Sequence, residues 1–139
     1  TLGEMAEPER SKHAELRRRL LSLGGEGVAL HHEEDIDLIL SKAVPTLGSK
    51  AELIRGQPCR CHANSGFLYD GNKDSIRVVT GWALSKDGCW RQHTWAVALW
   101  KPKSKDGSHL IETTEKRVAY YGFVLTKKQC ERWFYSNCI

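Results

Sequence analysis

The amino-acid sequence predicts an α+β domain with N-terminal helices, an antiparallel sheet of about four strands and a C-terminal helix. Two observations lead to this class. Apolar residues recur at helical spacing in the first part of the chain, and from Ser75 onward they alternate with polar residues in β-branched and aromatic segments. The chain has 139 residues, 40% of them hydrophobic, which suits one domain around one core. Helices, strands and a helix then follow in the order typical of α+β proteins.

The predicted helices flank the sheet in the sequence. The N-terminal part, residues 1–58, opens with an amphipathic pattern that predicts a helix over 7–23, ended by Gly24. Further along this part we expect a helix over 33–43, a loop over 45–49 and one helical turn over 50–55. In the last part, residues 126–139, Thr126 and Gln129 form a capping box that predicts a helix over 127–137.

The middle segment, residues 59–125, holds the predicted sheet. A short helix beginning at Cys61 is expected first, and we expect it to pack on the sheet face that carries His93. Gly88 suits the left-handed position of a tight hairpin loop over 86–88. Strands are expected over 75–85, 89–100, 109–114 and 117–125, with a polar turn over 103–108.

Charge and composition restrict the partners. The formal net charge is +4 and the Lys and Arg residues are spread along the chain, so a nucleic-acid-binding stripe is not expected. No apolar segment has the length of a membrane span, so no membrane association is expected. Five cysteines at irregular spacing favour a reducing compartment, such as the cytoplasm, or a domain delivered there as an effector. We leave the oligomeric state open.

Three polar residues stand in positions that suggest chemistry. Cys61 opens a predicted helix, where a thiol near an imidazolium has a lowered pKa. His93 shares a strand face with Trp95 because strand side chains alternate. Glu112 lies on the next predicted strand, so it can sit beside His93 if the two strands pair. A carboxylate on one imidazole nitrogen leaves the other nitrogen for a thiol, which predicts a Cys61–His93–Glu112 triad.

Other interpretations remain open at this point. Taken alone, Cys61 and His93 are better explained as packed side chains, and Glu112 could pair with Lys101, Arg117 or solvent. A zinc site is one alternative, built from Cys59, Cys61 and His62 with Cys130, Cys138 or His109. A binding module for protein or nucleic acid is another, with Trp82, Trp90, Trp95 and Trp100 gathered on a hairpin.

Several short sequence motifs between Cys61 and Thr114 resemble those of a known family. The order is a helix-opening cysteine, then IRVVTGWAL, then HTWAVALW, then HLIETT. This order resembles the core of the transglutaminase-like and papain-like cysteine enzymes over about 60 residues, Cys61 to Thr114. The matching positions are Arg77, Val78, Val79, Gly81 and Trp82, then His93, Trp95 and Val97, then Glu112 and Thr114. Glu112 replaces the family's usual Asp, and His62 stands where a tryptophan or a small residue is usual. The short motifs CHANS and ETT are also similar to motifs of small bacterial proteins.

The resemblance implies a thiol-dependent acyl transfer on an amide: proteolysis, deamidation or cross-linking. Cys61 would be the nucleophile, His93 the base and Glu112 the orienting group, with no cofactor and no metal. A protein or peptide substrate is expected. The backbone N–H of Cys61 would help to hold the oxyanion. Gln57, Asn64, Gln92 and Trp95 are the further oxyanion or substrate-binding candidates.

Overall fold

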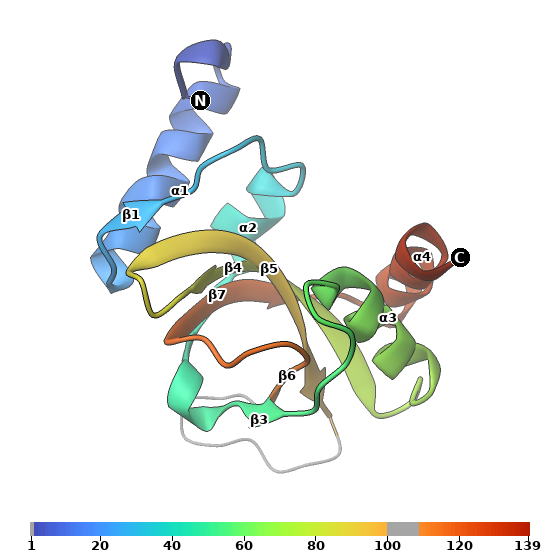
Figure 1. The fold of residues 1–139 in the computed structure, drawn as a ribbon. Helices are drawn as coiled ribbons and strands as arrows, with labels where there is room; N and C mark the ends of the chain where they lie inside the picture. The colour runs from blue at the N-terminus through green and yellow to red at the C-terminus, as the bar shows by residue number, and fades with distance from the viewer. Residues whose placement is uncertain (1, 100–108) are drawn as a thin grey trace.

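The structure, a computed structural model, describes residues 2–99 and 109–139 and is built around a curled, mixed β-sheet (Figure 1). Four α-helices accompany the sheet in this part of the chain, which confirms the α+β class. Trp100 and the expected turn over 103–108 lie outside the described residues. No helix among the described residues is long and apolar enough to cross a bilayer.

The N-terminal part contains the predicted helices and three strands that were not predicted. Its helical elements are η1 (Leu2–Glu4), α1 (Glu9–Leu23), α2 (Ile36–Lys42) and η2 (Gly48–Lys50). The additional strands are β1 (Gly27–Val28), β2 (Val44–Leu47) and β3 (Glu52–Leu53). The loop over 45–49 and the helical turn over 50–55 were therefore wrong in large part. These strands are too short to show a period of two, and their backbone pairs with longer strands elsewhere in the chain.

The second half follows the sequence prediction closely. It holds α3 (Cys61–Asp70), β4 (Ile76–Leu84), β5 (Cys89–Ala98), β6 (Leu110–Glu112), β7 (Ala119–Val124) and α4 (Lys127–Cys138). Gly88 adopts a φ of +86°, which confirms its left-handed position in the β4–β5 turn. Thr126 and Gln129 exchange the two hydrogen bonds of the capping box that begins α4.

The sheet is larger than four strands and is not purely antiparallel. Its order is β2-β7-β4-β5-β6-β3, and β1 pairs with β5 beside this path. The long neighbours are antiparallel, whereas β1 runs parallel to β5 and β3 runs parallel to β6. The two parallel pairs arise because the first part of the chain returns to the sheet twice. Its strand β1 joins the start of β5, and its strand β3 joins β6.

The two faces of the sheet carry separate cores. The larger cluster includes Trp82, Trp90 and Ala96 and packs against the helices. The smaller cluster fills the concave inner face and consists of Ala51, Val79, Ala83, Trp95, Leu110 and Tyr120, with Val97 partly buried against it. His93 lies on the inner face because it alternates in phase with Trp95.

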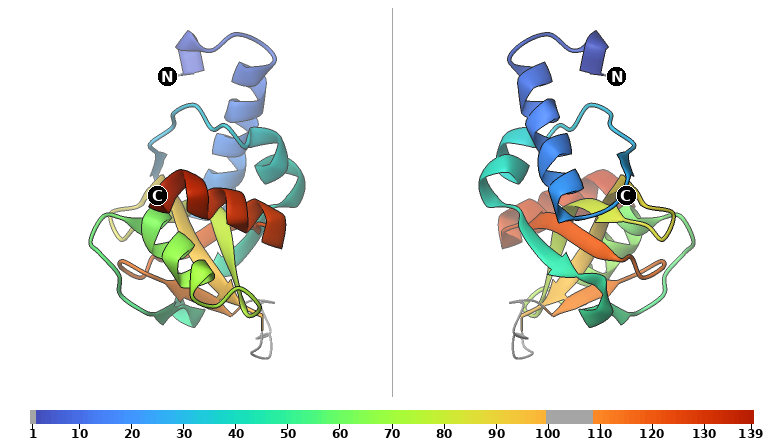
Figure 2. Two further views of the ribbon diagram at one scale, coloured as in Figure 1. Left: turned by 90° about the vertical axis from the view of Figure 1, so that its right-hand side faces the viewer. Right: turned by 90° about the vertical axis from the view of Figure 1, so that its left-hand side faces the viewer.

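Helix α3 packs on the outer face, so the expectation that it covers the face carrying His93 was wrong. Its Tyr69 is fully buried in the larger cluster, and α3 lies beside α4 in front of the strands (Figure 2, left). The alternation of β5 cannot show which face a helix from elsewhere in the chain will cover. Only the first turn of α3 approaches His93, from the edge of β5.

A pair of glycines makes room for the aromatic side chains of the inner face. Gly81 pairs with His93 on one side and with Gly122 on the other. A Cβ at Gly122 would lie 2.7 Å from two ring carbons of Trp95 and 2.7 Å from the carbonyl oxygen of Thr80. Any larger residue at this position therefore has to displace the indole.

We expect Gly122→Ala to lower the free energy of unfolding by about 1–3 kcal/mol, the usual cost of overpacking a core. Urea unfolding of both variants measures it, with Gly27→Ala as the control. Gly27 also lies in a strand, but its Cβ would meet no atom within 4 Å. Equal stability of Gly122→Ala and the wild type would contradict the close packing of Trp95.

Candidate active site

His93 and Glu112 are brought together by the pairing of β5 with β6. The register sets Ala96 opposite Ile111 and Val97 opposite Leu110. Continued by one step on the inner face, it places Glu112 diagonally beside His93. His93 Nε2 lies 2.8 Å from Glu112 Oε1 and 3.0 Å from Oε2. The predicted neighbourhood of these two strands and side chains is confirmed.

Glu112 is fully buried and its carboxylate is saturated with donors. The hydroxyl of Tyr120 donates to Oε1 over 2.8 Å. The Oε2 atom accepts the backbone N–H groups of Thr113 and Thr114 and the Thr114 hydroxyl, each over 3.0 Å. Burial raises the pKa of the Glu112 carboxyl. The His93 contact and these donors lower that pKa by more than burial raises it, so the net shift is downward. The carboxylate is therefore held ionised inside the protein.

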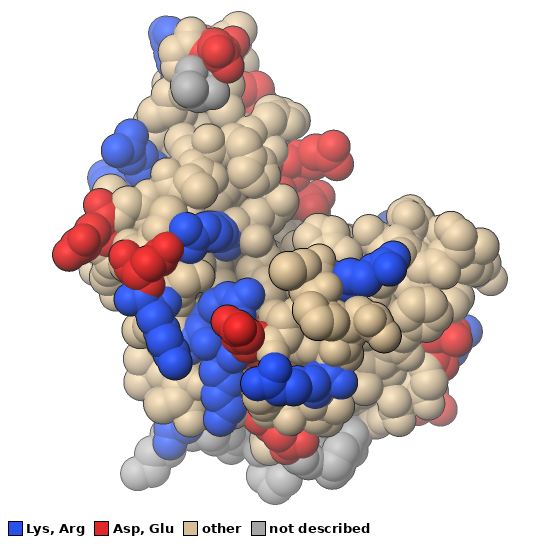
Figure 3. Space-filling view, viewed as in Figure 1, with Lys and Arg blue, Asp and Glu red and all other residues tan. Residues whose placement is uncertain are grey.

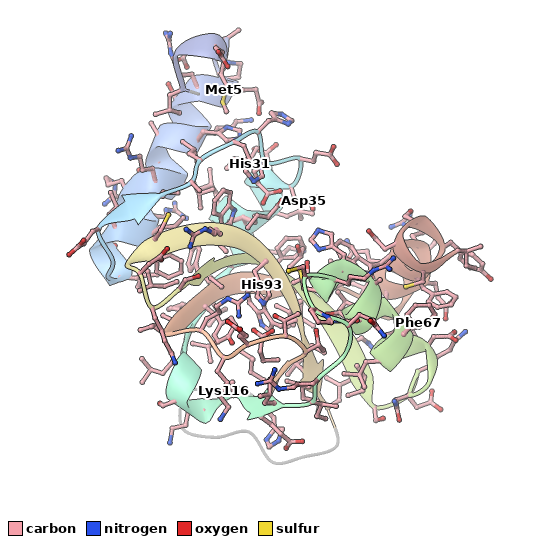
Figure 4. All side chains as sticks on the ribbon, in the orientation of Figure 1. Met5, His31, Asp35, Phe67, His93 and Lys116 are labelled. Atoms are coloured by element: carbon pink, nitrogen blue, oxygen red, sulfur yellow. The ribbon has the colours of Figure 1, made fainter. Side chains whose placement is uncertain are left out.

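The imidazole of His93 is clamped in place. Its ring stacks on Trp95 with centroids 5.9 Å apart and planes 26° apart. Burial lowers the pKa of His93, but the contacts with Cys61 and Glu112 outweigh it and raise the pKa above its usual value. Because Nε2 points at Glu112, Nδ1 is the nitrogen left for the thiol. Figure 4 shows His93 in the middle of the curled sheet, close to the start of α3.

Cys61 reaches His93 through a gap in the sheet edge. Strand β1 pairs only with Cys89 and Trp90 of β5, and β6 pairs only with Ala96 and Val97. The first turn of α3 approaches β5 between these two pairings (Figure 1). Cys61 is the first residue of α3, as predicted, and its side chain interacts with that of His93.

The Cys61 thiol has two imidazoles within reach. His62 Nδ1 lies 3.3 Å from Cys61 Sγ, and His93 is the second partner. Burial raises the pKa of the thiol, but the contacts with His62 and His93 together lower it to about 6. Cys61 is half-buried, whereas Cys130 is enclosed in the core. The arrangement produces a thiolate at neutral pH.

His62 is a residue of the site that the sequence interpretation missed. It was named as a possible zinc donor and as a departure from the family pattern, although its place directly after a helix-opening cysteine was a visible indication of a further role. Trp133 of α4 holds it in place: the two rings are 5.1 Å apart, and the Trp133 indole N–H donates to the His62 carbonyl over 3.0 Å. Tyr120, which supports Glu112, was also missed, because only the β4–β7 pairing brings it to the inner face.

A cleft of about 580 Å³ opens beside His62. Glu34, Asp35 and neighbouring residues line one wall, and Arg132 and Trp133 of α4 line the other. Burial, followed by the charges of Glu33 and Glu34, raises the pKa of Asp35. Figure 4 shows Asp35 on the segment that rises above β5. The cleft therefore opens beside the residue that follows the thiol in the chain.

The four oxyanion and substrate-binding candidates are placed differently from one another. Asn64 clamps the loop before α3: its Nδ2 donates to the Gln57 carbonyl over 2.8 Å, and its Oδ1 accepts the Gln57 N–H over 3.0 Å. Gln92 lies on the opposite face of β5 from His93, lines the cleft and donates to Glu33. Trp95 is 3% exposed and its ring stacks on that of His93.

A donor for an oxyanion remains in the backbone of α3. The hydrogen bond from the Asn64 N–H to the Arg60 carbonyl, 2.8 Å long, is the first one of the helix. The N–H groups of Cys61, His62 and Ala63 precede it and have no partner within the helix. They lie beside the sulfur, where a developing negative charge would form.

The geometry gives little support to the two alternative interpretations, a zinc site and a tryptophan-based binding module. Among the described residues, no three His, Cys, Asp or Glu side chains gather as a metal site would require. Cys130 is buried in the core, and Cys138 donates to the Ala63 carbonyl over 3.3 Å. The tryptophans at positions 82 and 90 are fully buried, so they form no stacking platform.

Comparison of the chain with protein-family models, curated proteins and solved structures finds no match. The function is therefore inferred from the site itself.

Proposed function

We propose that this protein is a thiol-dependent acyl-transfer enzyme that acts on an amide through Cys61, His93 and Glu112. One observation carries the proposal: a half-buried thiol with a lowered pKa interacts with a buried imidazole whose other nitrogen is bound to a fully buried carboxylate. A buried ion pair costs stability unless it is well bonded, and side chains placed in this way suit a reactive site better than a packing role.

The reaction proceeds in two halves. His93 Nδ1 accepts the proton of the Cys61 thiol, and the thiolate forms a bond with the carbonyl carbon as the π electrons move to oxygen. Backbone N–H groups at the start of α3 stabilise this oxyanion. The C–N bond then breaks, His93 returns the proton to the leaving nitrogen, and a thioester remains on Cys61. Water or an amine attacks the thioester and releases the thiol.

The substrate class follows from the surroundings of the thiol. The cleft beside His62 is open and lined by polar residues from α4 and the segment before α2, which suits a polypeptide better than a small enclosed ligand. The resemblance to transglutaminase-like cysteine enzymes agrees with this chemistry. Water as acceptor gives proteolysis or deamidation, and a lysine amine gives cross-linking.

The proposal is tested by alkylation of the native protein with iodoacetamide, followed by mass spectrometry. We expect the rate at Cys61 to reach half of its plateau near pH 6, because the thiolate forms as pH rises through its pKa of about 6. An unperturbed thiol would do so near 9.0. At pH 7 Cys61 should react about fivefold faster than an ordinary thiol, since a roughly ninetyfold larger thiolate fraction outweighs its lower nucleophilicity.

The other cysteines provide internal controls. Cys130 is buried and its pKa is raised, and the pKa of Cys138 is also raised by burial. Cys59 is exposed and two residues from Cys61, so it is the strictest comparison. His93→Ala and His62→Ala should each move the Cys61 midpoint to higher pH. Preferential labelling of Cys59, or a midpoint of Cys61 near 9, would refute the assignment.

A further inference from the structure

A second groove, separate from the cleft, is lined by residues of the loop before α3. One part, of about 620 Å³, is lined by Arg55, Lys86, Lys116 and Arg117 from three separate loops. A second part, of about 220 Å³, shares Arg55 and Arg117 with the first and extends to Cys59. We call both parts together the basic groove. Cys59 lines this groove and His62 lines the cleft, so along the chain Cys61 lies between a residue of each hollow.

The cations of the basic groove are largely uncompensated. Within residues 2–99 and 109–139, Arg55, Lys86 and Lys116 have no carboxylate partner, and the Arg117 guanidinium bonds to the Glu115 carbonyl and the Thr114 hydroxyl. Two carboxylates line the groove, and one of them, Asp87, already pairs with Arg91 over 2.8 Å. Figure 3 shows Lys and Arg side chains gathered over the lower middle of this face.

Elsewhere on the surface the cations are commonly paired within the chain. On α1, Glu15 binds both Arg18 and Arg19, and Lys12 binds Asp37. A groove that gathers four cations with two carboxylates therefore differs from the neutralised helix surface. Such a field attracts anionic groups toward the thiol.

We propose that the basic groove binds an acidic segment of the polypeptide substrate and positions an adjacent amide at Cys61. This proposal rests on the proposed acyl transfer and adds the substrate class. Glutamate and aspartate side chains suit Arg55 and Arg117, whose guanidinium groups bind carboxylates in a fork geometry. The separate cleft beside His62 carries Glu34 and Asp35, so acidic residues of the substrate are favoured in the basic groove only.

An acidic peptide fits better than a nucleic acid. None of the described residues that line the basic groove is aromatic, and single-stranded nucleic acids bind through base stacking on aromatic rings. Glu115 also stands in both parts of the groove and would repel closely spaced phosphates. Separate carboxylates can arrange themselves around it.

The test measures binding in the Cys61→Ala protein, so it does not depend on turnover. Fluorescence anisotropy compares labelled peptides of equal length, one rich in Glu, one rich in Lys and one rich in Gln, with a single-stranded oligonucleotide. The groove variant is Arg55→Glu/Lys86→Glu/Lys116→Glu. The matched control is Arg17→Glu/Lys42→Glu/Lys128→Glu, whose three cations are exposed and lie outside the groove. Both sets exchange one Arg and two Lys, so the net charge falls equally from +4 to −2.

We expect the Glu-rich peptide to bind best, with an affinity that falls as salt rises. The groove variant should weaken it roughly tenfold or more, and the control much less, because exposed ion pairs act locally. Equal losses in both variants, no measurable binding of the Glu-rich peptide at low salt, or tighter binding of the oligonucleotide would each overturn the proposal.

Acyl transfer is assessed separately by the alkylation of Cys61 described above. Selective binding of the acidic peptide with an unreactive Cys61 would leave the groove as a docking surface and remove the enzyme. A reactive Cys61 with no preference for the acidic peptide would leave the enzyme and remove this substrate class. The two failures are therefore distinguishable.

Discussion

Cys61→Ala is expected to abolish thioester formation, and His93→Ala to slow it by about 10²–10⁴-fold, the usual contribution of a positioned general base. An activated ester such as p-nitrophenyl acetate serves as acyl donor, and its burst of nitrophenolate reports the acylation of the thiol. The reason is the connected geometry: the pKa of the thiol is held low by His62 and His93, and Nε2 of the His93 ring lies at hydrogen-bond distance from Glu112.

Two matched controls separate chemistry from folding. Cys59→Ala removes an exposed thiol two residues away, and His109→Ala removes a half-buried histidine of the same sheet region. Both should keep the burst. Thermal unfolding of all four variants checks that the fold persists. A burst of wild-type size in Cys61→Ala would mean that the chemistry lies elsewhere in the protein.

Glu112→Gln is expected to reduce acylation by less than His93→Ala does, and to destabilise the fold by about 1–3 kcal/mol. The Oε2 atom of Glu112 accepts two backbone N–H groups and a hydroxyl, so the amide oxygen of a glutamine must take that place. Its NH₂ group then faces His93 Nε2 and the Tyr120 hydroxyl, which both donate to the native carboxylate.

The consequence for catalysis is a change of tautomer. Facing an NH₂ donor, His93 Nε2 has to accept, so the proton of the neutral ring moves to Nδ1. An Nδ1–H group pointing at Cys61 cannot take its proton. Some rate should remain, because the nucleophile and the backbone N–H groups are intact, so the loss should stay below that of Cys61→Ala.

Glu26→Gln is the matched control, since it makes the same chemical change at an exposed residue outside the site and the groove. It should leave both the burst and the stability unchanged. Wild-type acylation in a folded Glu112→Gln protein would show that the carboxylate has no part in the reaction. An NMR measurement of the His93 tautomer distinguishes the proposed mechanism from a purely structural effect.

The secondary structure was predictable where the sequence has a strong local pattern. Alternation predicted β4, β5 and β7, and the Thr126–Gln129 box predicted the start of α4. The same alternation put His93 on the face of Trp95, and pairing of consecutive strands put Glu112 beside it. Local patterns sufficed here because period and capping depend on neighbours in the chain.

The peripheral strands were not predictable in the same way. Gly27–Val28 and Glu52–Leu53 have two residues each, so neither has a period, and both become strands only by hydrogen bonding to β5 or β6. The roles of Asn64, Tyr120 and Trp133 were hidden for a related reason. Each is set by a partner far away in sequence: the loop before α3, the carboxylate of Glu112 and the ring of His62.

By itself, the sequence determined the α+β class, the long strands, the helix that begins at Cys61 and the alternation that aligns His93 with the inner face. Only the tertiary structure decided that α3 covers the outer face, that its first turn enters between β1 and β6, and that His62 supplies a second imidazole to the thiol. The physical reason is that local patterns arise from backbone sterics and nearest neighbours. The position of a thiol relative to a sheet edge instead depends on how the strands and helices of the described part of the chain pack together.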